Sequence, residues 1–188
     1  MSFDAQCDLA AVVYGAGDDP DRVISGFAAD LSRGGSRAVG VVQLGRSCQR
    51  EGPRLGVVVL PDGEVVGLAL PEETHGGGCR LDPDRLAGLA VRLAAAIEDG
   101  ADLVIINRFG RSEAEGNGLI DLIPQALGAD IPVLIAVPEQ RFDDWIRFSE
   151  GMNVRLDCRR EALDTWWRAV AGASRRRGTT ETFCEFAK

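Results

Sequence analysis

The chain has 188 residues, which suits one domain of ordinary size that buries about two-thirds of the surface its unfolded form exposes. Its hydrophobic fraction of 45% and charged fraction of 27% are ordinary for a soluble globular protein, and its longest apolar runs are far short of a membrane span. The net charge of −8 argues against a nucleic-acid-binding protein, because phosphate contacts need a positive surface.

The opening segment and the cysteines indicate a cytoplasmic protein without structural cross-links. The segment MSFDAQCDLA has no basic patch ahead of an apolar stretch, so it is not typical of a signal peptide. The five cysteines are odd in number, widely scattered and accompanied by one histidine, so neither a disulfide framework nor a metal site is expected. Every basic side chain is arginine except the last residue, Lys188.

The first part of the chain predicts a β-α-β unit. Residues 9–14 (LAAVVY) form a continuous apolar strand, and the loop GAGDDP leads into a helix over about residues 20–33. Asp19 can cap this helix and Pro20 can occupy its first turn. A second apolar strand is predicted at 39–43. Such continuous runs suit a parallel sheet that is covered on both faces.

Strands and helices continue to alternate after a hairpin, whose strands at 56–60 and 64–70 flank the turn sequence Pro61-Asp62-Gly63. Later strands are predicted at 103–106, 133–137 and 153–156. Helices are predicted at about 83–99, at 119–127 where Pro124 limits or kinks the helix, within FDDWIRFSEG, and at 160–172. The remaining residues lack periodicity and predict a flexible tail or a partner-docking arm.

This alternation predicts an α/β fold: a three-layer, doubly wound, mainly parallel sheet with a β-hairpin at one edge. We expect a single domain at 1–173 and a flexible C-terminal tail at 174–188. Ligands of such sheets bind at the carboxyl ends of the strands, where the strand order reverses. The candidate loops are GAGDDP, GRSCQREGPR and NRFGRSEAEGNG, together with the glycine-rich segment HGGGCRLD.

The first loop has the position of a phosphate-binding loop without its chemistry. A P-loop needs GxxxxGK[ST], with a lysine on the phosphates and a hydroxyl on Mg²⁺. The stretch from Gly15 to Arg22 has neither, and its carboxylates, Asp18 among them, would repel a triphosphate. These acids have a simpler role in capping the helix and complementing its positive end. A ligand-binding role for Gly15, Gly17 and Asp18 stays open.

Several blocks together resemble an uncharacterised bacterial family of unknown function. They are YGAGDDPDRVISGFAADL, GVVQ, GCRLDPDRLA, NRFGRSEAEGNGLIDLI and IPVLIAV, and the resemblance covers roughly residues 9–167. That family is related to P-loop nucleoside triphosphatases and is often encoded beside molybdate-transport genes. The resemblance therefore implies a P-loop-like α/β fold (P-loop NTPase-like, with a degenerate P-loop). It also implies a link to molybdenum handling, through molybdate-transport or molybdenum-cofactor proteins.

The resemblance also locates two missing acids. In the related triphosphatases the strand similar to DLVII ends in Asp-Glu, followed by an apolar residue, a glycine and a later glutamate. On this chain the acidic pair falls on Asn107 and Arg108, the glycine on Gly110 and the later acid on Glu113. The metal anchor is replaced by a cation, which favours an anion over Mg²⁺.

The loop NRFGRSEAEGNG is therefore the first candidate site, for a small tetrahedral oxyanion such as molybdate, tungstate, sulfate or phosphate. Arg108 and Arg111 supply cationic donors, while Gly110, Gly116 and Gly118 leave room for backbone amides. Glu113 and Glu115 could pin the arginines by bidentate pairing. The alternative is that these charges form solvated ion pairs. Only the resemblance selects molybdate.

The segment from His75 to Arg80 is the second candidate, because ordering its glycines, Gly77 and Gly78 among them, needs either a close-packed turn or an anion nest. His75 and Cys79 are too few to define a metal site, and Cys79 lacks a rigidly held base for catalysis. A plain flexible loop is the alternative for this segment.

Three hypotheses of function follow, none with an assigned catalytic residue or a certain cofactor. The first is a cytoplasmic, non-hydrolytic small-oxyanion binding or accessory protein linked to molybdate or tungstate handling. The second is a divergent nucleoside triphosphatase or nucleotide transferase that lacks the P-loop lysine. The third is a structural homo-oligomer with a decayed site.

Overall fold

The computed structural model describes residues 7–43, 56–69 and 81–181. Within them lies one seven-stranded sheet with the order β4-β3-β2-β5-β6-β1-β7. The strands are β1 (Leu9–Tyr14), β2 (Ala38–Gln43), β3 (Gly56–Leu60), β4 (Glu64–Gly67), β5 (Leu103–Ile106), β6 (Val133–Pro138) and β7 (Val154–Asp157). β3 pairs antiparallel with both β2 and β4, and the other four pairs are parallel, so the predicted mainly parallel sheet with a hairpin at one edge is confirmed.

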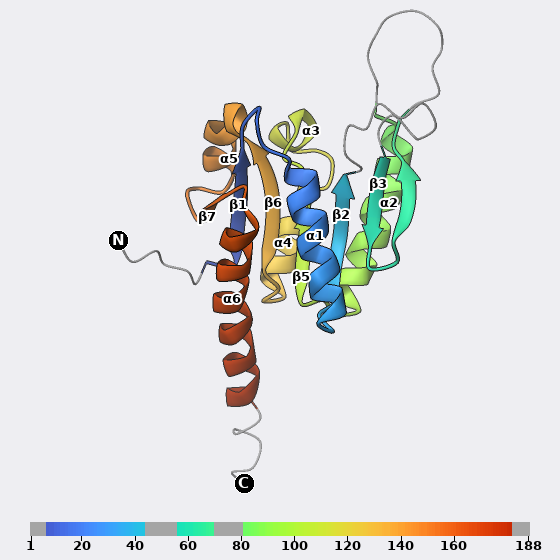
Figure 1. Ribbon diagram of the computed structural model, residues 1–188. Helices are drawn as coiled ribbons and strands as arrows, with labels where there is room; N and C mark the ends of the chain where they lie inside the picture. Colours follow the sequence, from blue (N-terminus) through green and yellow to red (C-terminus); the bar gives the residue numbers. More distant parts are fainter. Residues whose placement is uncertain (1–6, 44–55, 70–80, 182–188) are drawn as a thin grey trace, which may run out of the picture.

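Helices cover both faces of this sheet, as predicted (Figure 1). They are α1 (Pro20–Arg33), α2 (Pro83–Glu98), α3 (Arg111–Ala114), α4 (Leu122–Gly128), α5 (Phe142–Phe148) and α6 (Arg160–Glu181), with a 3₁₀ turn η1 (Glu139–Arg141) before α5. None of these helices, among the described residues, is long and apolar enough to cross a membrane.

Alternate strand residues build two separate cores. Ala11 and Val13 of β1 join the cluster under α2, α4 and α5, whereas Ala10 and Val12 join the cluster under α1 and α6. All four side chains are buried, which explains why the strand sequence is apolar throughout.

The strand order reverses between β1 and β6. The connection from β1 runs through α1 on one face to β2, whereas the connection from β6 runs through α5 on the other face to β7. The carboxyl ends of these strands are therefore where a ligand site is expected in a sheet of this kind.

Three element boundaries differ from the prediction. The helix expected at 119–127 begins at Leu122, and the preceding loop contains the short helix α3. The last helix continues to Glu181 instead of ending near Gly172, so the first part of the expected tail is helical. In Figure 1 this helix extends past the sheet, where there is no core to impose an apolar period on its sequence. The β4 strand ends at Gly67.

Gly40 shows how closely β2 and β5 approach. It lies opposite Ile105, has a φ of +136°, and a Cβ atom built on it would overlap the Ile105 carbonyl oxygen. Only glycine fits this position, because both the backbone conformation and the neighbouring strand exclude a side chain.

We expect Gly40→Ala to lower the free energy of unfolding by about 2 to 4 kcal/mol. The added Cβ atom would combine backbone strain with a clash against the main chain of β5. Gly26→Ala in α1 is the matched control, because nothing lies within 4 Å of its added Cβ. The control should stabilise by ~0.5 to 1 kcal/mol. Urea denaturation measures both, and equal stabilities of the two variants would contradict this account of β2.

Candidate functional site

The loop between β1 and α1 satisfies its own polar groups. The Asp18 carboxylate accepts a hydrogen bond from the Gly15 amide at 2.8 Å, and the Asp19 carboxylate accepts one from the Arg22 amide at 3.0 Å. The capping role predicted for Asp19 is therefore confirmed. Because Asp18 occupies the Gly15 amide, that donor is taken before any ligand arrives.

Asp21 has a different role from the helix capping that the sequence suggested. Its carboxylate accepts hydrogen bonds from Arg108 Nη2 at 2.9 and 3.1 Å and from Asn107 Nδ2 at 2.9 Å. Asp21 is 7% exposed and Asn107 is 4% exposed. The guanidinium carbon of Arg108 lies 5.3 Å from the centre of the Tyr14 ring. This partly buried ion pair joins α1 to the residues that follow β5.

The two partners stand where nucleotide chemistry would need opposite charges. With Gly15 as the first glycine of the GxxxxGK[ST] spacing, Asp21 falls at the lysine and Arg22 at the hydroxyl residue. Arg108 follows β5, where the resemblance places a metal-anchoring acid. A carboxylate thus replaces the ammonium group, and a guanidinium replaces the carboxylate. In the sequence, the signal for this pairing was that an acid stands at the lysine position and a base stands at the acid position.

Phe109 fixes the chain immediately after this pair. Its amide donates to the Ala136 carbonyl at 2.7 Å, and its fully buried ring packs edge-on against Trp145 with the ring centres 5.3 Å apart. Asn107 and Arg108 consequently lie between the buried strand β5 and the buried side chain of Phe109, which limits their freedom to rearrange.

Two polar atoms beside the ion pair have no partner among the described residues. They are Asn107 Oδ1 and Arg108 Nε, and both are buried. The amide orientation of Asn107 follows from its contact with Asp21, since a carboxylate requires the NH₂ group on that side. An unsatisfied acceptor therefore lies near an unsatisfied cationic donor, and buried atoms of this kind ordinarily bind a ligand or water.

A cavity of about 320 Å³ lies beside these atoms, on the face covered by α2 and α4. Its lining brings together five predicted site residues, namely Asn107, Arg108, Gly110, Arg111 and Glu113. Ser112 also lines the cavity and was missed, although it lies inside the predicted loop. Apolar residues such as Val41, Leu86 and Leu119 form much of the remaining wall.

The other predicted site residues that the structure describes do not line this cavity. Gly15, Gly17, Asp18, Glu115 and Gly116 are absent from its lining. The predicted residues of the second candidate, which are His75, Gly77, Gly78, Cys79 and Arg80, lie outside the described residues, as does the whole of the loop GRSCQREGPR.

The expected pairing of the loop's charges is partly wrong. Arg111 does pair with Glu115 at 3.0 Å, but their side chains are 83% and 59% exposed, as in the solvated alternative. Arg108 is held by Asp21 instead of a loop glutamate. Glu113 turns toward the main chain, where its carboxylate accepts from the Gly110 amide at 2.9 Å and also from the Leu119 amide.

Glu113 shapes the loop from within. Gly118 has a φ of +78°, and a Cβ atom there would overlap the Glu113 carboxylate, so the glycine makes room for the acid. Burial raises the pKa of Glu113 above its ordinary value, although hydrogen bonds from main-chain amides and the charge of Arg141 act in the opposite direction.

Cys158 is close enough to the β1–α1 loop to sense its charges and is a poor nucleophile. Burial raises the pKa of its thiol to about 11, and the negative charges of Asp18, Asp19 and Asp21 add to the effect. Cys7 and Cys158 are both free thiols. In the described part of the chain, no group of three His, Cys, Asp or Glu side chains is placed to hold a metal ion.

Fold and site together define an α/β domain of the P-loop type in which the phosphate-binding lysine and the metal-anchoring acid are exchanged for an ion pair of reversed sense. The chain belongs to the family described as protein of unknown function (DUF2478), whose model matches residues 9–166. The resemblance drawn from the sequence is thereby confirmed as to family.

Two similar proteins bear on this fold and site. The molybdenum import ATP-binding protein ModC 2 of Bradyrhizobium diazoefficiens is 37% identical over 172 residues, which are 89% of this chain and 19% of that protein. The chain thus spans about a fifth of the length of this relative. The crystal structure of THEP1 from the hyperthermophile Aquifex aeolicus matches with a TM-score of 0.61 at 14% identity, over 86% of this chain and 96% of that one. This likeness shows the fold alone, a P-loop NTPase-like α/β sheet with helices.

We predict that Arg108→Met lowers the free energy of unfolding by ~3 to 5 kcal/mol, because it leaves the Asp21 carboxylate buried without its cation. The double variant Asp21→Asn with Arg108→Met should recover at least half of that loss, since the introduced side-chain amide is uncharged and keeps an acceptor for Asn107. Chemical denaturation of both variants gives the comparison. Additive losses in the double variant would show that the two side chains act independently.

We also predict that ionisation of Glu113 opposes folding. Because its folded-state pKa is raised, the folded chain binds the proton more tightly, so stability falls as pH rises from the ordinary glutamate pKa through the raised value. The stability of wild type relative to Glu113→Gln should therefore decrease over that window and be constant below it. Denaturation at a series of pH values checks this, and a relative stability that rises with pH would contradict it.

Proposed function

We propose that this protein is a non-hydrolytic small-oxyanion binding or accessory protein that acts in molybdate or tungstate handling. The observation that carries the proposal is the ion pair between Asp21 and Arg108, which occupies the place of the groups that would bind phosphates and Mg²⁺. The same ion pair supports both the absence of hydrolysis and the anionic ligand.

The ion pair disfavours nucleotide hydrolysis for electrostatic reasons. A carboxylate at the lysine position repels the β and γ phosphates instead of neutralising them. Asp18 and Asp19 add negative charge to the same loop, as the raised pKa of the Cys158 thiol reflects. A cation at the end of β5 likewise repels Mg²⁺. Neither half of the usual catalytic machinery has a functional substitute in these residues.

The cavity beside Asn107 and Arg108 supports an oxyanion in place of the nucleotide. Arg108 Nε is a cationic donor without a partner among the described residues, and Arg111 and Ser112 line the same cavity. Charge-assisted hydrogen bonds from such groups are strong contributors to anion binding. The Glu113 carboxylate, which belongs to the same lining, accepts a hydrogen bond from the Gly110 amide.

The choice of molybdate or tungstate comes from a relative. A segment similar to nearly all of this chain is part of a protein named for molybdenum import and ATP binding. Because this segment occurs within a protein named for molybdenum import, a partner in molybdate transport is favoured for this chain. The arginines beside the cavity support a small anion, and they do not discriminate among tetrahedral ones.

The fold favours a second candidate, a divergent nucleoside triphosphatase or nucleotide transferase. Its likeness to THEP1 extends over most of both chains. This candidate needs arginines to replace the missing lysine, and Arg108 is already engaged by Asp21. It is therefore the less favoured function.

Calorimetric titration of the whole chain in Mg²⁺-free buffer with molybdate, tungstate, sulfate and phosphate tests the proposal. We expect an oxyanion to bind and Arg111→Gln to weaken it by about tenfold, because one charge-assisted hydrogen bond is lost. Arg147→Gln is the matched control, since Arg147 is 76% exposed on α5 and outside the cavity lining.

Two results would overturn this function. Oxyanions that fail to bind, or that bind Arg111→Gln as tightly as wild type, would remove the proposed site. Mg²⁺-dependent phosphate release from ATP or GTP, above that of a Glu113→Gln control, would favour the nucleoside triphosphatase. A concentration-dependent oligomer without any of these ligands would favour the structural role.

A further inference from the structure

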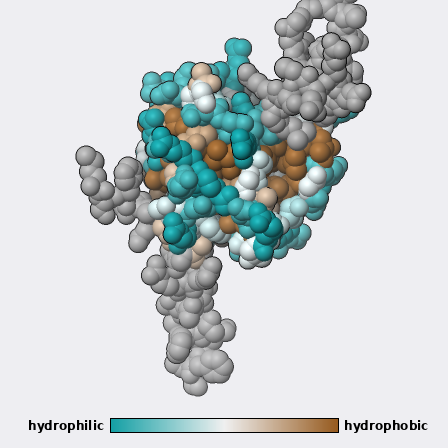
Figure 2. Space-filling model, in the orientation of Figure 1, coloured by the Kyte–Doolittle hydropathy of each residue, from teal (hydrophilic) through white to brown (hydrophobic). Residues whose placement is uncertain are grey.

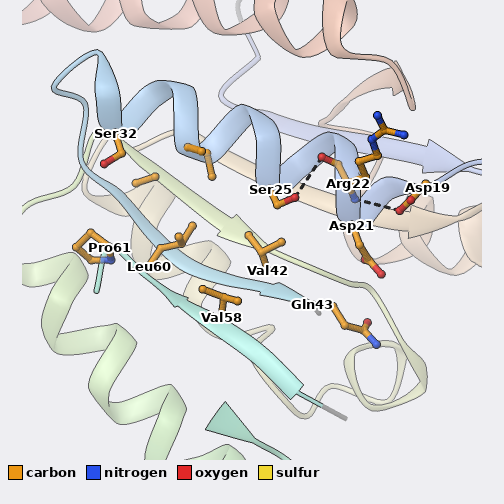
Figure 3. Close-up of a pocket in the computed structure, with 13 residues that line it drawn as sticks. Asp19, Asp21, Arg22, Ser25, Ser32, Val42, Gln43, Val58, Leu60 and Pro61 are labelled. Carbon is orange, nitrogen blue, oxygen red and sulfur yellow. Dashed lines mark hydrogen bonds between the residues drawn. The ribbon is translucent and has the colours of Figure 1, made fainter. Parts of the chain in front are cut away.

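A larger cavity, of about 530 Å³, lies on the other face of the sheet (Figure 3). It is bounded by α1 on one side and by β2 and β3 on the other. Its lining is mainly apolar and includes Ala28, Ala29, Val42, Val58 and Leu60. Apolar surface is exposed beside α1 on this face of the molecule (Figure 2). The volume and lining are those of a site for a small organic molecule.

Polar groups gather at one end of this cavity. Figure 3 shows Asp21 and Gln43 at the end nearest the start of α1, while Leu60 and Pro61 lie at the opposite end. The guanidinium of Arg22 points away from Val42 and Gln43 in the same view. A ligand lying along the cavity would therefore meet hydrogen-bonding groups at one end and apolar side chains over the rest of its length.

Asp21 retains capacity to accept a further hydrogen bond. Its Oδ1 accepts from both Asn107 and Arg108, whereas Oδ2 accepts one longer contact of 3.1 Å from Arg108. An ionised carboxylate offers about four lone-pair sites, and the described residues occupy three of those of Asp21, which leaves one for a donor that reaches it from this cavity. The Gln43 amide can supply a second acceptor.

Electrostatics at the polar end favour a positive ligand. Asp19 and Asp21 both line the cavity, and Asp18 lies beside them in the same loop. The negative charge of these three carboxylates reaches Cys158, whose thiol pKa they help to raise. The guanidinium of Arg108 offsets only part of this charge, because it approaches Asp21 from the β5 side and lines the other cavity.

We propose that this cavity binds an organic cation with a compact apolar body, such as an amidinium, guanidinium or amine attached to a ring or short chain. The N–H groups of the cation donate to Asp21 and Gln43, and its apolar body packs against Val42, Val58 and Leu60. This site is separate from the oxyanion site and takes a ligand of the opposite charge.

Benzamidine is a suitable probe, with benzamide as its neutral counterpart of the same shape. Ligand-observed NMR on the whole chain, in buffer free of multivalent oxyanions, measures both affinities. We expect benzamidine to bind at least about tenfold more tightly than benzamide, since its cationic N–H groups face a carboxylate. In Asp21→Asn that preference should shrink to about threefold or less, with circular dichroism confirming that the variant is folded.

A second pair of variants tests the site without disturbing the ion pair. Ala29→Leu narrows the cavity from its exposed wall and should weaken benzamidine about tenfold or more. Gly26→Leu puts the same side chain on α1 outside the cavity lining and should leave binding unchanged. Equal affinities for benzamidine and benzamide, or undiminished binding by Ala29→Leu, would overturn the proposal. Because oxyanions are left out, neither result depends on the oxyanion site.

Discussion

The ion pair between Asp21 and Arg108 is the interaction that connects the parts of this molecule. It joins the first turn of α1 to the residues after β5, two segments that are adjacent only because β1 is followed by a crossover to β2. Tyr14 packs against the same guanidinium, so the end of β1 is included as well. Since the side chains are only 9% and 22% exposed, each charge depends on the other to offset its loss of water. The carboxyl edge of the sheet is held in one arrangement as a result.

This pair also determines which chemistry the scaffold can support. Catalysis of phosphoryl transfer needs positive charge on the phosphates and a carboxylate on the metal, both arranged before the substrate arrives. Here Asp21 and Arg108 stand at the corresponding positions with the opposite charges. The two side chains neutralise each other instead of a phosphate and a metal ion. A buried pair of this kind seldom adds much stability compared with apolar side chains. Stability alone is therefore a weak explanation for a partly buried ion pair at the carboxyl edge of the sheet.

The sequence predicted what local patterns encode and missed what distant contacts decide. The bounds of β1 and α1 follow from an apolar run and from Asp19-Pro20, and both were predicted correctly. The partner of Arg108 was not, because Asp21 is 87 positions away and looked like one more acid at a helix start. The turn of helix at α3 was missed because glycines surround it, whereas burial of Phe109 and the inward carboxylate of Glu113 order the segment. Helix α6 was ended too early, since its last part runs past the sheet and carries no apolar period.

The two cavities differ in the sign of the charge that each would accept, and the ion pair is a wall of both. Asp21 lines the cavity beside α1, and Arg108 lines the cavity beside α2 and α4. Under the two proposals, an anion that draws on Arg108 leaves the Asp21 carboxylate less neutralised, which strengthens its attraction for a cation on the opposite face. Thermodynamic linkage makes this reciprocal, so the cation must favour the anion by the same factor. The coupling needs no movement of helices, because the shared ion pair already lies between the two sites. A change in its hydrogen bonding on one face alters the net charge that a ligand meets on the other face.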